Sequence, residues 1–311
     1  MRNNPADTSE EIAFDRRATA PAGEIVEVSP LVRRVIAGNG GPMTFTGTCS
    51  YIVGRGMVAI IDPGPDDPAH IARLLDAVSG ETVSHIVVTH THRDHSPAVP
   101  AIKLATGATV VGCGPHRPAR ELALGEINPL DSAGDHAYAP DRVLREGDAV
   151  EGPGWRLETV ETPGHTANHL AFALPQEETL FSGDHVMAWS TTIVAPPDGS
   201  MADYMASIET LRGRSDRIYR PGHGGPVTEP QRFLRGLVQH RRQREAAILN
   251  RLQAGDETIS QMVPTIYQGL ALALHGAAAL SVLAQLEDLV MRGAVSSSDP
   301  HPQLDSRYRL S

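Results

Sequence analysis

The chain has 311 residues and a formal net charge of −10, with 27 lysines and arginines against 37 aspartates and glutamates. This length allows one large or two ordinary domains, and the acidic balance argues against a protein that grips nucleic acid through many phosphate contacts. The two cysteines, Cys49 and Cys113, form no C-x-x-C pair, which argues against a cysteine-based zinc site and fits a reducing cytoplasm.

The sequence pattern does not suggest a membrane protein. The first 25 residues lack the apolar run of a signal peptide, so we expect a cytoplasmic location. The most apolar later stretch, residues 269–286, is interrupted by His275, Ser281 and Gln285, which disfavours a membrane span.

The pattern along the chain predicts a flexible arm over residues 1–22 and a first domain over residues 23–227. Apolar, β-branched runs predict strands at residues 31–37, 48–53, 57–62, 84–88, 109–111, 155–161, 169–174, 179–182 and 217–219. Amphipathic spacing predicts helices at residues 67–78, 96–105 and 201–212. This alternation indicates an α/β fold with two sheets covered by helices, an αββα sandwich.

The pattern changes at residue 228. Helices are predicted at residues 230–253, 258–268 and 277–292, and a small hairpin from residue 293. Residues 228–311 are therefore expected to form a winged-helix-like C-terminal domain.

The densest group of candidate ligands is Thr89-His90-Thr91-His92-Arg93-Asp94-His95, directly after the buried strand predicted at residues 84–88. Alternate side chains of an extended segment point the same way, so His90 and His92 can reach one ion together. Asp94 and His95 follow in a turn that can direct them to a second position. Neutral imidazoles and carboxylates are ligands for zinc and neighbouring transition metals, whereas a solvated polar loop is the alternative.

Four further polar residues lie where predicted strands end, each with a glycine one or two positions away: Asp62, His165, Asp184 and His223. Glycine permits tight turns and a close backbone approach. Four coincidences of this kind favour one common site.

These motifs resemble the metallo-β-lactamase-fold superfamily, whose HxHxDH signature is matched by His90, His92, Asp94 and His95. Residues 41–48, 162–166, 203–208, 221–224 and 240–245 are similar to the β-lactamase-like protein 2 group. That group carries a C-terminal winged helix, and its studied members act as single-strand endoribonucleases.

The resemblance implies two metal ions, of which Zn²⁺ is expected and Mn²⁺ or Fe²⁺ are alternatives. It implies that the first ion is held by His90, His92 and His165, the second by Asp94, His95 and His223, and that Asp184 bridges them. Asp62 matches the family aspartate that holds ligating imidazoles through their other ring nitrogen.

Two ions about 3.5–4 Å apart can share a water and lower its pKa from 15.7 to near 7. The sequence therefore predicts a hydrolase that uses a metal-bridging hydroxide, with Asp94 placed to orient or accept its proton. A phosphodiester in single-stranded RNA is the expected substrate. His169 and His185 are candidates for protonating the leaving group, by adjacency alone.

Other side chains have both a functional and a structural interpretation. His169 and His185 could equally be packed or hydrogen-bonded. Thr191, Thr192 and Tyr204 could line the substrate pocket, or they could cap and pack the helix predicted from residue 201. Arg241, Arg242, Arg244 and Arg251 could form an RNA-facing strip, but we favour a solvated face or an interdomain contact.

A glyoxalase-II-like thioester hydrolase of a small metabolite is the main alternative, because it shares every ligand and the acidic balance suits it. A true β-lactamase is disfavoured, since the resemblance implies that such enzymes lack the carboxylate matched by Asp184. A non-catalytic winged-helix protein with a structural metal domain is a further alternative. The C-terminal domain is expected either to bind substrate or to cover the sandwich and form a homodimer.

Overall fold

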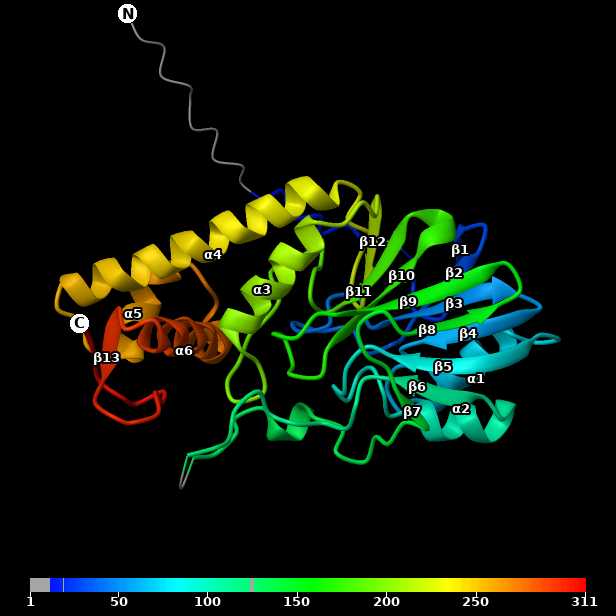
Figure 1. Cartoon of the computed structure of the whole chain (residues 1–311), viewed down its shortest axis with the longest axis horizontal. Coiled ribbons are helices and arrows are strands. Elements are labelled where there is room, and N and C mark those ends of the chain that lie inside the picture. Colours follow the sequence, from blue (N-terminus) through cyan, green and yellow to red (C-terminus); the bar gives the residue numbers. More distant parts are fainter. Residues whose placement is uncertain (1–11, 19, 124–125) are drawn as a thin grey trace, which may run out of the picture.

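The computed structural model describes residues 12–18, 20–123 and 126–311. Two sheets lie face to face at the centre of the larger part (Figure 1). The first has seven strands in sequence order: β1 (Ile25–Ser29), β2 (Val32–Ile36), β3 (Cys49–Arg55), β4 (Met57–Ile61), β5 (Thr82–Val88), β6 (Thr109–Gly112) and β7 (Arg142–Val143). It is antiparallel from β1 to β4 and parallel from β4 to β7.

The second sheet has five strands, in the spatial order β12 (Ile218–Pro221), β11 (Thr179–Gly183), β10 (Leu170–Leu174), β9 (Trp155–Glu161) and β8 (Ala149–Gly152). Only the β11–β12 pair is parallel. The strand β10 shows how the layers form, because alternate side chains point to opposite faces. Phe172 and Leu174 belong to the core between the sheets, whereas Ala171 and Ala173 belong to the core under the outer helices.

Helices cover both outer faces. The helices α1 (Pro68–Ala77) and α2 (Val99–Thr106) bury Leu74 and Ile102 against the first sheet. The helices α3 (Met201–Arg212) and α4 (Pro230–Gln253) bury Ile208 and Leu234 against the second. The predicted αββα sandwich is therefore confirmed.

The helix α4 runs along both parts of the chain (Figure 1) and contributes side chains to two cores. Its first half packs on the second sheet, and Ile248 and Leu252 of its last turns join the core of the C-terminal module. That module adds α5 (Ile259–Ile266), α6 (His275–Met291) and a hairpin of β13 (Val295–Ser297) with β14 (Tyr308–Leu310). Three short 3₁₀ turns, η1 (Asp131–Ala133), η2 (Pro175–Glu177) and η3 (Leu272–Leu274), lie in the connections.

The segment Leu272–Met291 has the length and apolar composition of a membrane span. In the structure its Leu283, Leu286 and Leu289 are buried in the core of the C-terminal module, as in a core helix. The cytoplasmic location stays a prediction.

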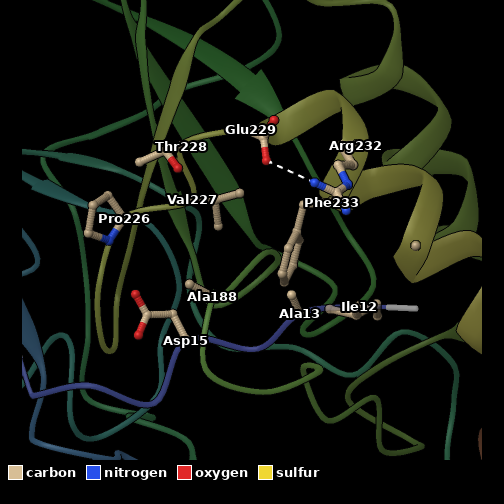
Figure 2. A pocket seen from close by; sticks show the side chains of 11 residues that line it. Ile12, Ala13, Asp15, Ala188, Pro226, Val227, Thr228, Glu229, Arg232 and Phe233 are labelled. Carbon is tan, nitrogen blue, oxygen red and sulfur yellow. Dashed lines mark hydrogen bonds and ion pairs between the residues drawn. The ribbon is translucent and has the colours of Figure 1, made fainter. Parts of the chain in front are cut away.

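Part of the predicted arm contacts the body of the protein. Residues 1–11 and 19 lie outside the described residues. The Phe14 ring meets Phe233 of α4 edge-on, with centroids 6.2 Å apart, and the backbone N–H of Asp15 donates to the carbonyl of Ala188 at 2.9 Å. Figure 2 shows the hollow that this segment lines together with Ala188 and Phe233.

Candidate metal centre

The candidate ligands meet because neighbouring strands end at one edge of the sandwich. The parallel neighbours β4 and β5 are followed by Asp62 and His90, and the parallel neighbours β11 and β12 are followed by Asp184 and His223. His165 comes from the loop between β9 and β10. The carboxyl ends of parallel strands lie side by side, so residues distant in sequence converge there.

One set of ring nitrogens is spaced as ligands of a single ion would be. His92 Nδ1 lies 3.1 Å from His90 Nε2 and 3.0 Å from His165 Nε2. Two nitrogens on one tetrahedral zinc ion, each about 2.0–2.1 Å from it, are about 3.3 Å apart. The set fits a metal ion without large movements.

A second set lies beside the first. Asp94 Oδ2 is 3.1 Å from His223 Nε2 and 3.4 Å from His95 Nε2. Asp184 faces both sets: its Oδ2 is 3.7 Å from His165 Nε2 and 3.3 Å from His223 Nε2, and its Oδ1 is 3.5 Å from His95 Nε2. The structure thus brings together all seven residues that the sequence singled out as ligands, with Asp184 between the two groups.

Two buried atoms of this cluster lack a hydrogen-bond partner, although oppositely charged groups lie 3.4 Å and 3.5 Å away. His95 Nε2 and Asp184 Oδ1 have no hydrogen bond to any described residue. Leaving a buried polar atom unpaired costs free energy, so these atoms indicate a missing group. Imidazole and carboxylate donors suit a divalent metal ion, and the residues present fit two of them.

Asp62 orients a ligand in each set. Its Oδ2 accepts from His95 Nδ1 at 2.9 Å and from Thr89 Oγ1 at 2.7 Å, and Thr89 Oγ1 in turn accepts from His90 Nδ1 at 3.0 Å. These bonds leave the Nε2 atoms of His95 and His90 free for a metal. This is the arrangement expected of an aspartate that supports ligating imidazoles.

The two sets have opposite protonation preferences. Burial lowers the pKa of His90 well below its usual range, that of His92 to about 3, and that of His165 below its usual range. Burial acts in the same direction on His95 and His223, but the neighbouring carboxylates outweigh it. They raise the pKa of His95 well above its usual range and that of His223 to about 10.

The pKa values of the two carboxylates are shifted as well. Burial tends to raise the pKa of Asp94 and Asp184, but His95 and His223 outweigh it and hold both values well below the usual range. The metal-free cluster therefore holds ionised carboxylates beside two protonated imidazoles.

Most of the side chains predicted to line the pocket are buried. His169 Nε2 accepts the backbone N–H of Asp184 at 3.1 Å, and its Nδ1 donates to Thr162 Oγ1 at 2.8 Å. His185 and Tyr204 are buried with their rings 4.5 Å apart. The buried positions of these three residues therefore do not support the prediction that they contact substrate.

The threonines differ from each other. Thr192 Oγ1 lies 3.1 Å from Nδ1 of the ligand His165, although the residue is buried. Thr191 is half-buried and stays a prediction for the pocket wall.

Sequence reasoning missed several contacts of the ligands. Thr48 Oγ1 donates to Asp94 Oδ2 at 3.1 Å, and the carbonyl of Gly47 accepts from His223 Nδ1 at 3.3 Å. Gly47 is the last residue of the glycine-rich segment 38–47 and Thr48 follows it; the composition of this segment was the only signal. The carbonyl of Ile193 accepts from His165 Nδ1 at 2.7 Å, and no sequence pattern marks a backbone acceptor.

Comparison with known proteins agrees with this site. Residues 43–223, more than half of the chain, match the metallo-beta-lactamase superfamily. The chain belongs to this superfamily, and it is a metal-dependent hydrolase. Residues 258–300 match the beta-lactamase associated winged helix domain, which confirms the predicted C-terminal module.

Particular relatives narrow the comparison. The beta-lactamase-like protein 2 homolog of Caenorhabditis elegans is 29% identical over 283 residues, which cover 89% of each chain. An atrochrysone carboxyl ACP thioesterase of Cryptosporiopsis sp. (strain 8999) is 27% identical over 83% of this chain and 79% of its own. The predicted resemblance to the β-lactamase-like protein 2 group is thus confirmed.

A solved structure matches the fold of the whole chain. The beta-lactamase domain protein from Burkholderia ambifaria has a TM-score of 0.77 and 20% sequence identity, covering 98% of this chain and 99% of its own. At this identity the match concerns the fold alone.

Replacing Asp62 tests its support of the ligands. Asp62→Asn removes the negative charge that His95 and Thr89 share, so we expect metal affinity to fall about 10-fold to 100-fold. A chelator competition with zinc measures this. Asp66→Asn, at an exposed neighbouring position, is the matched control and is expected to bind like the wild type. Unchanged affinity in Asp62→Asn would contradict the assigned role.

Metal binding is expected to release protons. His95 and His223 are protonated at pH 7 in the metal-free protein, and a metal ion needs them neutral. Affinity should therefore rise as pH increases from about 7 toward 10, because protons compete less. Titration calorimetry in two buffers of different ionisation enthalpy should report about two protons released per chain. Heats that do not depend on the buffer would contradict this.

Proposed function

We propose that the protein is a dinuclear metal-dependent hydrolase that cleaves the thioester of an acyl group. The observation that carries the proposal is the position of Asp184 between two sets of ligands. A structural zinc site fills all four positions with protein atoms, whereas seven ligands shared by two ions leave positions open for water and substrate. Zn²⁺ is the proposed ion in both sites.

The ions would supply a shared water of lowered pKa and would polarise the carbonyl under attack. The protein's own part is proton handling and orientation. The side chain of Asp94 is 25% exposed and that of Asp184 is 9% exposed. Asp94 is thus the carboxylate that can meet an incoming water, and the hydroxyl of Thr48 holds its Oδ2 in place. We assign Asp94 to accept the proton of the attacking water. We assign Asp184 to fix the two sets of ligands relative to each other.

The leaving group favours a thioester. A thiol has a pKa of about 8.5, so a thiolate departs with little help from an acid. The alkoxide released from a phosphodiester is far more basic and benefits from a proton donor. The two candidate donors, His169 and His185, are both buried, and His169 is committed to the backbone of Asp184 and to Thr162.

The surroundings of the ligands suit an acyl group. Phe45 and Trp189 stack with centroids 5.1 Å apart, and Trp189 also lies against Gly224, next to the ligand His223. Met43, on the same loop as Phe45, is 49% exposed. An apolar wall of this kind gains free energy when it covers hydrocarbon. The relative from Cryptosporiopsis, named as a thioesterase, supports the same substrate class.

Three of the four arginines predicted for the RNA-facing strip make contacts within the protein, whereas Arg242 is exposed. Arg241 is buried, Arg244 donates to the carbonyl of Ile266 at 2.7 Å, and Arg251 pairs with Asp256 at 2.6 Å. These contacts agree with the interdomain and solvated interpretation favoured from the sequence. Because these arginines are engaged within the protein, fewer cationic side chains are available to bind RNA phosphates.

A phosphodiester in single-stranded RNA is the second candidate. Arg93 is exposed between the ligands His92 and Asp94, where it could meet a phosphate, and the Phe45–Trp189 pair could stack on a base. A homodimer and a role of the C-terminal module in substrate binding stay predictions.

A substrate panel separates the two candidates. Zinc-loaded protein is expected to hydrolyse an acyl-pantetheine thioester at least about 100-fold faster than bis(p-nitrophenyl) phosphate or a single-stranded RNA oligonucleotide. Asp184→Asn should lose activity about 1000-fold, because this carboxylate would hold both ions. Asp203→Asn, at an exposed position, is the control.

Two other results of these experiments would contradict parts of the proposal. Cleavage of RNA without thioester hydrolysis would favour the second candidate. Full activity in Asp184→Asn would contradict the shared carboxylate.

A further inference from the structure

Arg241 is a buried cation in the middle of α4, with 4% of its surface exposed. Its Nη2 donates to the carbonyl of Thr192 at 2.6 Å, and its guanidinium lies 4.9 Å from the centroid of the Tyr204 ring. Its own carbonyl accepts from Gln285 of α6 at 3.4 Å. Arg241 therefore joins α6 of the C-terminal module to the loop after β11.

The first route from Arg241 to the metal centre runs through the backbone. The carbonyl of Thr192 belongs to the peptide bond that precedes Ile193, and the carbonyl of Ile193 accepts from His165 Nδ1 at 2.7 Å. That bond places the proton on Nδ1 and leaves Nε2 free, 3.0 Å from His92 Nδ1. Holding the peptide thus fixes both the orientation and the tautomer of one ligand.

The second route runs through stacked rings. Tyr204 lies between the Arg241 guanidinium and the His185 ring, whose centroid is 4.5 Å from that of Tyr204. His185 directly follows the ligand Asp184. All three stacked groups are buried, so a shift of Arg241 is passed on to the backbone that carries Asp184.

The chemistry of Arg241 suggests more than a contact between domains. Among the described residues no carboxylate forms an ion pair with its guanidinium, which meets a carbonyl oxygen and a ring face instead. Keeping a buried charge without a counter-charge is costly. A planar guanidinium can donate and stack at the same time, which a lysine cannot do.

We propose that Arg241 is a positioning residue, through which the C-terminal module fixes the ligands His165 and Asp184 of the metal centre. The proposal rests on the two metal sites of the proposed function and does not depend on the substrate. It predicts that the module influences metal binding although it contributes none of the seven ligands.

The helix offers a matched control. Arg244 makes the same pair of contacts within the C-terminal module: it donates to the carbonyl of Ile266 at 2.7 Å, and its guanidinium lies 4.7 Å from the centroid of the Tyr267 ring. Its replacement removes equivalent stabilising contacts without reaching the metal centre.

The test compares Arg241→Gln, Arg241→Lys and Arg244→Gln, each loaded with Co²⁺. We expect both Arg241 variants to bind cobalt about 10-fold more weakly or worse, by chelator competition, with an altered visible absorption spectrum. Arg244→Gln is expected to lower the melting temperature and to keep the wild-type affinity and spectrum. Arg241→Lys keeps the positive charge. If Arg241→Gln does not fold, the cobalt affinity and spectrum of Arg241→Lys provide the test.

Two outcomes would overturn the proposal. If the Arg241 variants lower the melting temperature as Arg244→Gln does, with wild-type cobalt affinity and spectrum, Arg241 is structural only. If the wild type binds no cobalt, the proposal fails together with the metal centre. If the wild-type protein hydrolyses no thioester but the Arg241 variants bind cobalt more weakly as expected, the positioning role of Arg241 stands. Only the proposed substrate class is then overturned.

Discussion

The buried carboxylate of Asp184 is the constraint on which the rest of the site depends. Asp184 directly follows β11, His223 follows the parallel neighbour β12, and the oxygens of Asp184 face ligands of both sets. The backbone leaves it little freedom, because a Cβ at Gly222 would lie 2.4 Å from Oδ1. The N–H of Asp184 is held by His169. This closely confined carboxylate therefore has a fixed position among the other candidate ligands.

The C-terminal module is part of this arrangement. Because α4 contributes Leu234 to one core and Ile248 to the other, the two parts of the chain share a continuous helix. Arg241 lies between these two contacts, where neither core could shift without moving it. This position explains why an arginine in a solvated-looking run of charges is buried against the loop that orients His165.

The local signals in the sequence were strong, and the long-range ones were weak. The ligands could be predicted because histidines and aspartates stood beside glycines at the ends of apolar runs, and α3, α4 and β9 matched their predicted limits. The edge strand β1 was missed because Glu27 interrupts its short apolar run. The helix α2 begins at Val99 and not at Ser96, because the Ser96 hydroxyl turns aside to Asp135. The contact of Arg241 with Thr192 joins residues 49 apart, which no local pattern encodes.

The central claim is that two metal ions share Asp184. The most direct test is a crystal structure of the zinc-loaded protein, with anomalous data collected on both sides of the zinc absorption edge. The account predicts two anomalous peaks about 3.5–4 Å apart, each within bonding distance of one Asp184 oxygen. One peak, or two peaks of which only one contacts Asp184, would contradict it.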